Sequence, residues 1–386
     1  MPPKNHVSSG AGTDPDSPGG PRAAPGRPRP RADTSPPRLR STDIARLAGV
    51  SVAAVSIAVN GRPGLSDATR KRILDVADEL NWRPHLAARA LKGAANDVVG
   101  IVIARPARTL GVEPFFAQFL SGLQSCLSNR GIATQLLIVE DTETQLTVYR
   151  RWAAENRVDG LVLLDLAVDD TRPPLVASLG IPAVVLGSHG NPMELTSVWV
   201  DDHAATVSIL RHLVALGHRR IGHVSGTAAY QHTQRRLRAI DDVRDSTGID
   251  VTSVATDYSD AQGASATRRL LEADPRHTAL VYDNDVMAVA GLGVATELGI
   301  PVPGEVSVVS FDDSVLTTMA HPSLTALTRD TFALGTLTAT ELLRVMAERP
   351  APRAVQAPTP RLVVRQSTAP PAGGRSTGPC EFPEIP

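Results

Sequence analysis

Cysteine and long apolar runs are scarce in this chain of 386 residues, and both absences exclude classes of protein. Two cysteines, Cys126 and Cys380, are too few for a disulfide framework, which fits a reducing compartment. No apolar run approaches the roughly 18 residues that a membrane span requires. Residues 1–40 also lack the charged segment and apolar stretch of a secretory signal. The sequence therefore predicts a cytoplasmic protein with no membrane partner.

Motifs of common enzyme and cofactor sites are missing as well. Gly291-x-Gly293 lies within an expected helix, and Thr296 stands where a dinucleotide fingerprint requires a third glycine. There is no P-loop, nucleophile elbow or paired-cysteine site. Four histidines lack the helical spacing of metal ligands, and we interpret them as structural: His203, His212, His218 and His223. We therefore expect no cofactor, no metal site and no catalytic residues.

Charge is unevenly distributed, although the formal net charge of the whole chain is −1. Residues 1–97 carry 15 Lys and Arg against 9 Asp and Glu, a net charge of +6, whereas the remainder has a net charge of −7. A basic front and an acidic body indicate that two regions handle two different partners, with nucleic acid at the front.

The two ends of the chain have the composition of disordered segments. Residues 1–40 contain 10 Pro, 5 Gly and no aromatic residue, together with 7 Lys and Arg. Such a segment buries too little apolar surface to offset its ordering entropy, so we predict a disordered basic arm. Residues 369–386 contain 5 Pro and predict a second disordered tail.

Helical periodicity runs from Ser41 to about Gly93. Helices are expected over residues 43–48, 51–59 and 66–80, with caps at Ser41 or Thr42, at Ser51 and at Ser66. Two short helices joined by a Gly turn, with a third packed across them, form a helix-turn-helix, whose second helix fits the DNA major groove. An ordinary small helical bundle has the same spacing and stays open as an alternative.

From residue 98 onward, short apolar runs alternate with segments of helical length. This pattern is typical of parallel strands covered on both faces. The units are too many for one modest sheet, so we predict an α/β fold of two doubly wound subdomains with a ligand cleft between them. The expected strands are 98–104, 134–139, 160–164, 183–186, 221–224, 279–282 and 306–310.

The segment TDIARLAGVS, residues 42–51, closely resembles the headpiece of the lactose-repressor (LacI/GalR) family of bacterial transcription regulators. The likeness continues through the Trp82-Arg83-Pro84 corner and the Ala88-Arg89-Ala90-Leu91 run to about residue 369. It implies a helix-turn-helix headpiece over residues 41–83 and a hinge helix over residues 84–93. It further implies a periplasmic-binding-protein-like domain over residues 98–368 that binds an effector and dimerises.

In that family the start of the second helix faces base edges, and the matching positions are Val52, Ala53, Ala54 and Ile57. Members usually have Thr at the position of Ala54 and often a long polar residue at that of Ile57. Ala and Ile cannot make the bidentate hydrogen bonds that read guanine or adenine, but they can contact thymine methyl groups. The resemblance therefore implies an operator read largely through apolar contact and shape, with weaker discrimination per base.

Contacts to the DNA backbone need only donors and charge. A single arginine is more often a solvated surface charge, whereas the net charge of +6 favours nucleic acid. The candidate backbone contacts are Ser51, Ser56, Asn60, Arg62, Arg70 and Arg83. By resemblance to the family hinge helix, Leu91 is expected to wedge into the minor groove beside Ala88 and Arg89, and a linker leucine packed on the body is the alternative.

The resemblance also assigns effector contacts in the body. Phe115 and Phe116 from one subdomain offer aromatic faces, with core packing an equal alternative for Phe116. Arg236, Asn284 and Asp312 from the other subdomain offer groups that fix hydroxyls or amines. Two positions depart from the family pattern: Gly187 replaces a frequent Asp, and Glu113 replaces a common Asn. The ligand is therefore not expected to be a typical hexose.

Together these features predict a homodimeric transcription repressor that binds a pseudopalindromic DNA operator under control of a small-molecule effector. A sugar is the effector class that the resemblance implies, with a nucleobase or another metabolite as the alternative. Two other functions stay open: a small-molecule-binding protein with degenerate operator reading, and an α/β enzyme, for which no catalytic set of residues is present.

Overall fold

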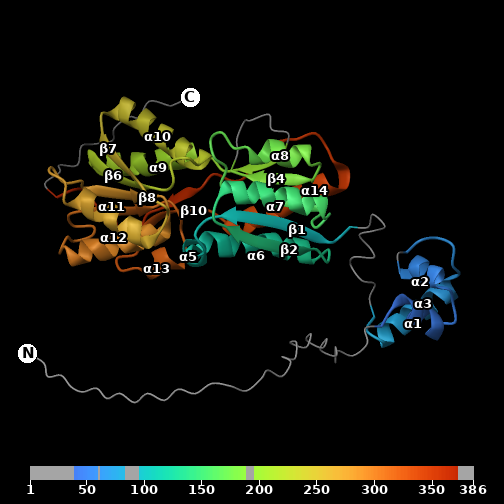
Figure 1. Cartoon of the computed structure of the whole chain (residues 1–386). Coiled ribbons are helices and arrows are strands. Elements are labelled where there is room, and N and C mark those ends of the chain that lie inside the picture. The colour runs from blue at the N-terminus through green and yellow to red at the C-terminus, as the bar shows by residue number, and fades with distance from the viewer. Residues whose placement is uncertain (1–38, 60, 83–94, 188–194, 373–386) are drawn as a thin grey trace, which may run out of the picture. The chain divides into compact units, whose positions relative to one another are not determined.

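The computed structural model describes residues 39–59, 61–82, 95–187 and 195–372 (Figure 1). The chain divides into two compact units, residues 1–84 and residues 85–386, and each is treated by itself. The predicted hinge over residues 84–93 lies outside the described residues, as does most of both predicted tails. So do five of the predicted DNA contacts: Asn60, Arg83, Ala88, Arg89 and Leu91.

The first unit contains the predicted helix-turn-helix. Helix α1 (Ser41–Leu47) and helix α2 (Val52–Val59) meet at an angle of 101°, and helix α3 (Asp67–Glu79) packs against both. The turn between α1 and α2 depends on Gly49, whose φ of 64° lies in the left-handed region. Val50 N then donates to Ala45 O at 2.9 Å, which closes the turn.

Two of the predicted caps are confirmed and one is wrong. Ser51 Oγ accepts from Ala54 N, and Ser66 Oγ accepts from Thr69 N. Neither Ser41 nor Thr42 caps α1, because the helix begins one residue earlier, where Arg40 N donates to the Asp43 carboxylate at 2.8 Å. A side chain three residues into the helix thus binds the backbone N–H of the N-cap, half of a capping box.

The buried residues of the first unit join its three helices to the segments on either side. The core consists mainly of Ile44, Val55, Ile73 and Trp82, all 9% exposed or less. Trp82 Nε1 donates to Leu39 O at 3.0 Å, which ties both ends of the unit together. Residues 39–40 therefore belong to the helical unit, and the predicted arm over residues 1–40 ends two residues too late.

The second unit contains two six-stranded sheets, which form the two α/β subdomains that the sequence predicted. One subdomain has the strand order β11-β5-β4-β3-β1-β2, and the other has β12-β10-β9-β8-β6-β7. The pairs of neighbouring strands are parallel except for the antiparallel pair β10–β12. The strands of the first subdomain are β1 (Val98–Ala104), β2 (Ala133–Val139), β3 (Gly160–Leu163), β4 (Ala183–Leu186), β5 (Thr196–Trp199) and β11 (Ala354–Gln356). Those of the second are β6 (Arg220–Ser225), β7 (Asp250–Ala255), β8 (Ala279–Tyr282), β9 (Ser307–Ser310), β10 (Thr325–Thr328) and β12 (Arg361–Val363).

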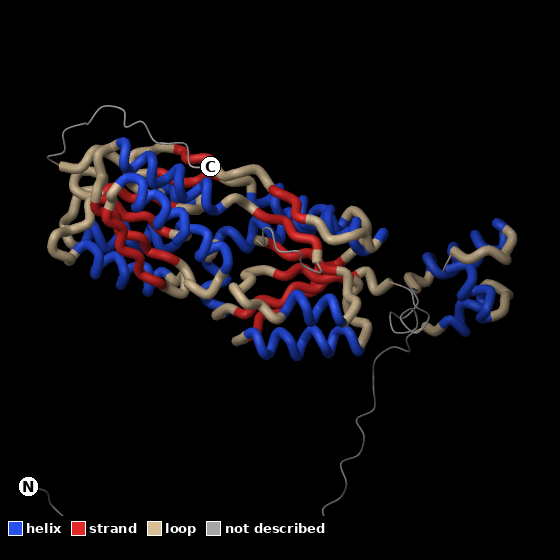
Figure 2. Tube along the Cα trace, turned by 90° about the horizontal axis from the view of Figure 1, so that it is seen from above, coloured by secondary structure: helices blue, strands red, loops and turns tan. Residues whose placement is uncertain are grey.

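Helices lie on both faces of each sheet, as Figure 2 shows in blue against the red strands. The first subdomain is built with α5 (Ala107–Val112), α6 (Pro114–Ser128), α7 (Thr142–Ala154), α8 (Arg172–Ser178) and α14 (Thr331–Glu348). The second is built with α9 (Asp202–Ala215), α10 (Gln231–Thr247), α11 (Asp260–Leu271), α12 (Asp285–Glu297) and α13 (Val315–Met319).

The chain crosses between the subdomains three times: after β5, after β10 and after β11. The second crossing brings α14 back to the first subdomain, where Figure 1 shows it in red among green elements. There it packs closely on α6, because Gly122 and Gly335 let the two backbones approach. A Cβ atom on Gly335 would lie 2.1 Å from Phe119 O, so a side chain cannot fit there without a shift.

Ala369, the first residue of the predicted C-terminal tail, is bound to the second subdomain. Its carbonyl accepts hydrogen bonds from His218 Nε2 and Ser307 Oγ, and its N–H donates to Ser307 Oγ. The boundary of the predicted tail at residue 369 is therefore too early.

Across the described residues no single helix is long and apolar enough to cross a membrane, and α1 with α2 passes that test only as a bent pair.

Candidate functional site

The start of helix α2 presents short apolar side chains to solvent. Val52 is 44% exposed and Ala53 is exposed, whereas Ala54 and Ile57 are half-buried. Between residues 51 and 55 the only polar side chain is that of Ser51, which caps the helix. Such a surface can contact thymine methyl groups and offers few hydrogen bonds to base edges.

Arg70, a predicted backbone contact, is turned toward its own protein. Its guanidinium donates to Ala58 O at 3.1 Å and to Arg62 O at 2.5 Å, so it binds the carbonyls at the end of α2 and in the turn that follows. Carbonyl groups at the end of a helix lack partners within the helix, and a bound guanidinium satisfies them. Arg70 therefore positions α2, whereas Arg62 is itself exposed.

The second unit has a cleft between its two subdomains, enclosing about 700 Å³ up to its open mouth. All five residues that the sequence assigned to effector binding line this one cleft. Phe115 and Phe116 come from the first subdomain, and Arg236, Asn284 and Asp312 come from the second. The walls also carry the apolar side chains of Leu164, Leu186, Val200 and Leu334. Aromatic and apolar walls with a few convergent polar groups are typical of a small-molecule site.

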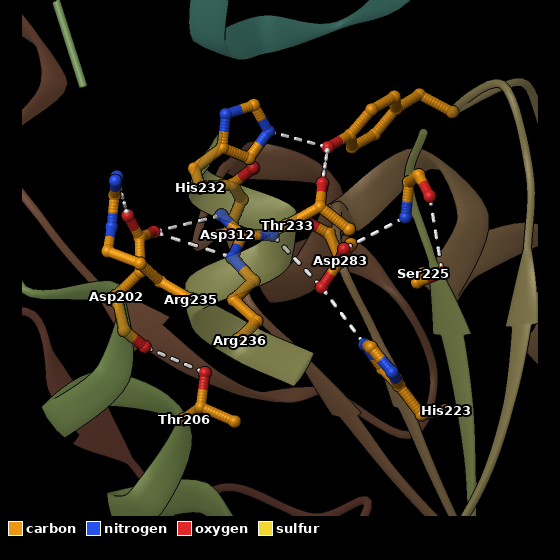
Figure 3. Close-up of polar contacts among 12 residues, drawn as sticks. Asp202, Thr206, His223, Ser225, His232, Thr233, Arg235, Arg236, Asp283 and Asp312 are labelled. Carbon is orange, nitrogen blue, oxygen red and sulfur yellow. Dashed lines mark hydrogen bonds and ion pairs between the residues drawn. The ribbon is translucent and has the colours of Figure 1, made fainter. Parts of the chain in front are cut away.

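Arg236 is the centre of a buried ionic network, shown in Figure 3. It is 4% exposed, and its guanidinium lies 3.3 Å from Asp202 Oδ1 and 3.0 Å from Asp283 Oδ1. The same group stacks on the ring of Phe311, with Cζ 3.4 Å from the ring centroid. The guanidinium group of Arg236, which the sequence assigned to ligand binding, is therefore already bound by two carboxylates.

Both carboxylates have further partners. Asp202 Oδ2 accepts from Arg235 at 2.9 Å, and Asp283 accepts from His223 Nε2 and from Gly226 N (Figure 3). Burial alone would raise the pKa of Asp283, but Arg236 and then His223 outweigh it and hold that pKa below its usual range. This half of the cleft keeps its carboxylates ionised and balanced by arginines.

Arg105, which follows β1, forms a second network on the other wall. Its guanidinium lies 3.0 Å from Glu113 Oε1 and 2.7 Å from Asp165 Oδ2. It also lies over the rings of Phe116 and Tyr258, at 5.3 and 4.5 Å from their centroids. The ring of Tyr230 lies 5.4 Å away as well, so one cation serves two carboxylates and three aromatic rings, two of which belong to the opposite subdomain.

Glu113 is poorly neutralised by this arrangement. Its side chain is 7% exposed, and no described residue hydrogen-bonds its second oxygen, Oε2. Burial raises the pKa of Glu113 to about 8, because Arg105 offsets the loss of water only in part and Asp165 adds a like charge. Burial lowers the pKa of His232, on the same cleft, to about 4, so its imidazole is neutral.

Asn284 and Asp312 lie in the cleft with most of their polar atoms engaged. Asn284 Oδ1 caps α12 by accepting from Met287 N, and its Nδ2 donates to Tyr258 O. Asp312 forms a short ion pair with Arg329. The ring of Phe115 is also in contact with an arginine, since Cζ of Arg329 lies 4.9 Å from its centroid.

Sequence profiles of two known protein families match this chain. The profile of bacterial regulatory proteins, lacI family, matches residues 42–85, and that of the periplasmic binding protein-like domain matches residues 210–368. The transcriptional regulator MalR of Streptomyces coelicolor is 32% identical over 349 residues, which cover 87% of this chain and 98% of MalR. The chain belongs to the LacI family.

Other proteins of the family support the same assignment. The transcriptional repressor PurR of Photobacterium profundum is 28% identical over 84% of this LacI-family chain and 97% of its own length. The structure of the lac repressor dimer bound to operator and the anti-inducer ONPF has 26% identity and a TM-score of 0.75. The CelR–cellobiose complex has 27% identity and a TM-score of 0.65. Each covers 86% of this chain and is itself covered completely. The chain is a DNA-binding transcription regulator, and these relatives are regulators rather than enzymes.

Several polar and charged residues that line the LacI-family cleft were not predicted from the sequence. Most of them follow directly after the carboxyl end of a strand, where parallel sheets place ligands. That position was the available signal for them, whereas His232 lies on α10 and gave none. The missed residues are Arg105, Asp165, Asp202, His232, Tyr258, Asp283 and Arg329.

Proposed function

We propose that this LacI-family chain is a repressor that binds a pseudopalindromic operator as a homodimer, with an affinity set by a small molecule in the cleft. The observation that carries the proposal is the meeting of all five expected effector residues, from two subdomains, on one cleft in a chain that also has a helix-turn-helix. The lac repressor structure is a dimer on operator, which favours the same assembly for this chain.

Effector control needs a cleft that opens and closes, and the contacts across its edge are of a kind that can break. Val168 N donates to Ala229 O at 3.0 Å, and Gln231 N donates to Leu166 O at 2.8 Å. These two backbone hydrogen bonds join the subdomains beside the cleft. A ligand that binds one arrangement of the subdomains better than the other shifts their equilibrium, and with it the affinity for operator.

We further propose a sugar as the effector class. The CelR structure holds cellobiose, and the cleft offers aromatic faces, apolar walls and carboxylates that can accept from hydroxyl groups. For DNA, we propose that Val52, Ala53, Ala54 and Ile57 contact base edges, that Ser51, Ser56, Asn60, Arg62 and Arg83 contact phosphates, and that Ala88, Arg89 and Leu91 enter the minor groove. Five of these lie outside the described residues: Asn60 and Arg83 are proposed from their donors and charge, and Ala88, Arg89 and Leu91 from the family resemblance.

The experiment is an electrophoretic mobility shift of the full chain with the DNA upstream of its own gene. Ala53→Asp places a negative charge on the exposed start of α2, so we expect a loss of specific binding of about 100-fold or more. Leu74→Asp, at a site on α3 that is 37% exposed, is the matched control. Equal binding by the Ala53→Asp variant and the wild type would refute the assignment of α2.

A second candidate function is a small-molecule-binding protein that reads no operator. The apolar, short side chains of Ala53, Ala54 and Ile57 favour it, because they cannot donate to bases. The same mobility-shift experiment separates the two functions. A complex that forms equally on upstream DNA and on unrelated DNA supports this second candidate.

A further inference from the structure

The two halves of the effector cleft differ in their charge balance. Around Arg236 the carboxylates Asp202 and Asp283 face two guanidinium groups, those of Arg235 and Arg236. Charges in this half are therefore equal in number. A ligand entering this half finds carboxylates that are already neutralised by neighbouring side chains.

The half of the cleft beside the phenylalanines carries an excess of carboxylates. Glu113 and Asp165 share the single guanidinium of Arg105. Asp312 takes the guanidinium of Arg329, and Asp285 lies close behind it. Among the described residues, Asp285 has no Lys or Arg within ion-pair distance. The three carboxylates that line this half, together with Asp285 behind the lining, thus share two guanidinium groups.

Two of these carboxyl groups have raised pKa values, because the nearby cations do not compensate for their burial. Glu113 has its pKa raised to about 8 by burial, in spite of the adjacent Arg105. Burial, together with the negative charge of Asp312, raises the pKa of Asp285 to about 6. Both carboxyl groups are 7% exposed or less. A positive charge bound beside these two carboxyl groups would therefore stabilise their ionised forms and replace the proton.

Space for a ligand lies beside this excess. Oε2 of Glu113 has no described hydrogen-bond partner, and Glu113 lines the cleft. Gly187, which follows β4 of the same subdomain, also lines the cleft, and a Cβ there would have no atom within 4 Å.

Resting on the proposed function, we infer that the effector is a sugar or a similar polyhydroxylated molecule carrying a protonated amine, which Glu113 binds. Glu113 Oε2 accepts from the ammonium group, whose charge compensates the excess on the Phe115 side. Phosphorylated and carboxylated sugars are excluded by the same charge balance, because the three arginines that line the cleft are already paired with carboxylates.

The test is calorimetric titration of the full-length chain with mono- and disaccharides, each in neutral, amino and phosphorylated or carboxylated form. We expect an amino member to bind at least about tenfold more tightly than its neutral parent, since a hydrogen bond between charged groups is worth more than a neutral one. A neutral or anionic member that binds as tightly as its amino form, or a panel in which no amino member binds, overturns the inference.

The variant Glu113→Gln keeps the size of the side chain and removes its charge. It is expected to lose the preference for the amino form by about tenfold, and Glu143→Gln, on the exposed face of α7, is the matched control. In the wild type, binding of the amine releases a proton from Glu113 to the buffer, so the binding heat depends on the ionisation enthalpy of the buffer. The charged groups that act on Glu113 are Arg105, Asp165, Asp285 and Asp312. A preference for the amino form that persists in Glu113→Gln contradicts the role of Glu113.

The same ligands separate this inference from the proposed function. A neutral sugar that binds and changes operator affinity leaves the proposed function intact and refutes the inference. An amino sugar that binds preferentially but never changes operator affinity supports the inference and refutes effector control.

Discussion

The exposed start of helix α2 and the walls of the cleft are built from opposite kinds of side chain. At α2, Val52, Ala53 and Ile57 offer methyl groups and no charge. In the cleft, three arginines and five carboxylates are held within a few ångströms of one another. Under the proposed function, apolar contact and DNA shape supply specificity at the first surface, whereas charge placement supplies it at the second.

The largest effect is expected from removing the centre of the ionic network. Arg236→Met leaves Asp202 and Asp283 buried with less compensation, so we expect the free energy of unfolding of the second unit to fall by about 3–5 kcal/mol. Denaturant unfolding measures this change, and Arg150→Met, at an exposed site on α7, serves as control. A loss of unfolding free energy no larger than that of the control would show that the network does not stabilise the second unit.

The next effect concerns the scaffold that brings α14 back to the first subdomain. Gly335→Ala places a Cβ 2.1 Å from Phe119 O and should destabilise the second unit by about 1–3 kcal/mol. Gly293→Ala, in α12, meets no atom within 4 Å and should stabilise by about 0.5–1 kcal/mol. Thermal unfolding of the two variants distinguishes close packing from helix propensity. The same sign of change in both would contradict the packing argument.

Arg70 tests whether an arginine of the first unit stabilises the fold, as Arg236 does in the cleft, or contacts a DNA phosphate. Arg70→Met removes donors to Ala58 O and Arg62 O, so we expect the first unit to lose about 1–2 kcal/mol and operator affinity to fall at all salt concentrations. A phosphate contact would instead lower the salt slope by about one, with no loss of stability. Arg72→Met, at an exposed site on the same helix, is the control.

The smallest effect over a single pH unit is a pH dependence of the second unit. Because the pKa of Glu113 in the folded chain is about 8, above the usual 4.5 of a glutamate carboxyl, the folded state holds the proton more tightly and stability falls as pH rises between these values. The difference in unfolding free energy between wild type and Glu113→Gln should therefore shift against the wild type by at most about 1.4 kcal/mol per pH unit. Unfolding at pH values across this window measures it, and a difference that is constant with pH would contradict the raised pKa.

Sequence patterns predicted the strands with continuous apolar runs and missed most of the shorter ones. All seven predicted strands are present, and 98–104, 183–186 and 279–282 coincide with β1, β4 and β8. These strands are apolar on both faces. The pattern gave no sign of five strands: the edge strands β7, β11 and β12, and the short, largely buried β5 and β10, which lie inside the two sheets. Short edge strands depend on the neighbour that they pair with, which local sequence does not encode.

The candidate site was predicted in its positions and only partly in its chemistry. Phe115, Arg236 and Asp312 do line one cleft. The sequence interpretation treated Arg236 as free to bind ligand, because Asp202 and Asp283 lie on segments far from it along the chain. Their meeting depends on the strand order of the second sheet and on the crossing after β5, and neither can be deduced from spacing.

The central claim is that the cleft and helix α2 are energetically coupled. Its most direct test is the Kd of the effector, measured on the full chain with and without saturating operator. The account predicts that operator changes this Kd by about fivefold or more, and by the same factor by which effector changes the Kd of operator. An effector Kd that is identical in both conditions would contradict it.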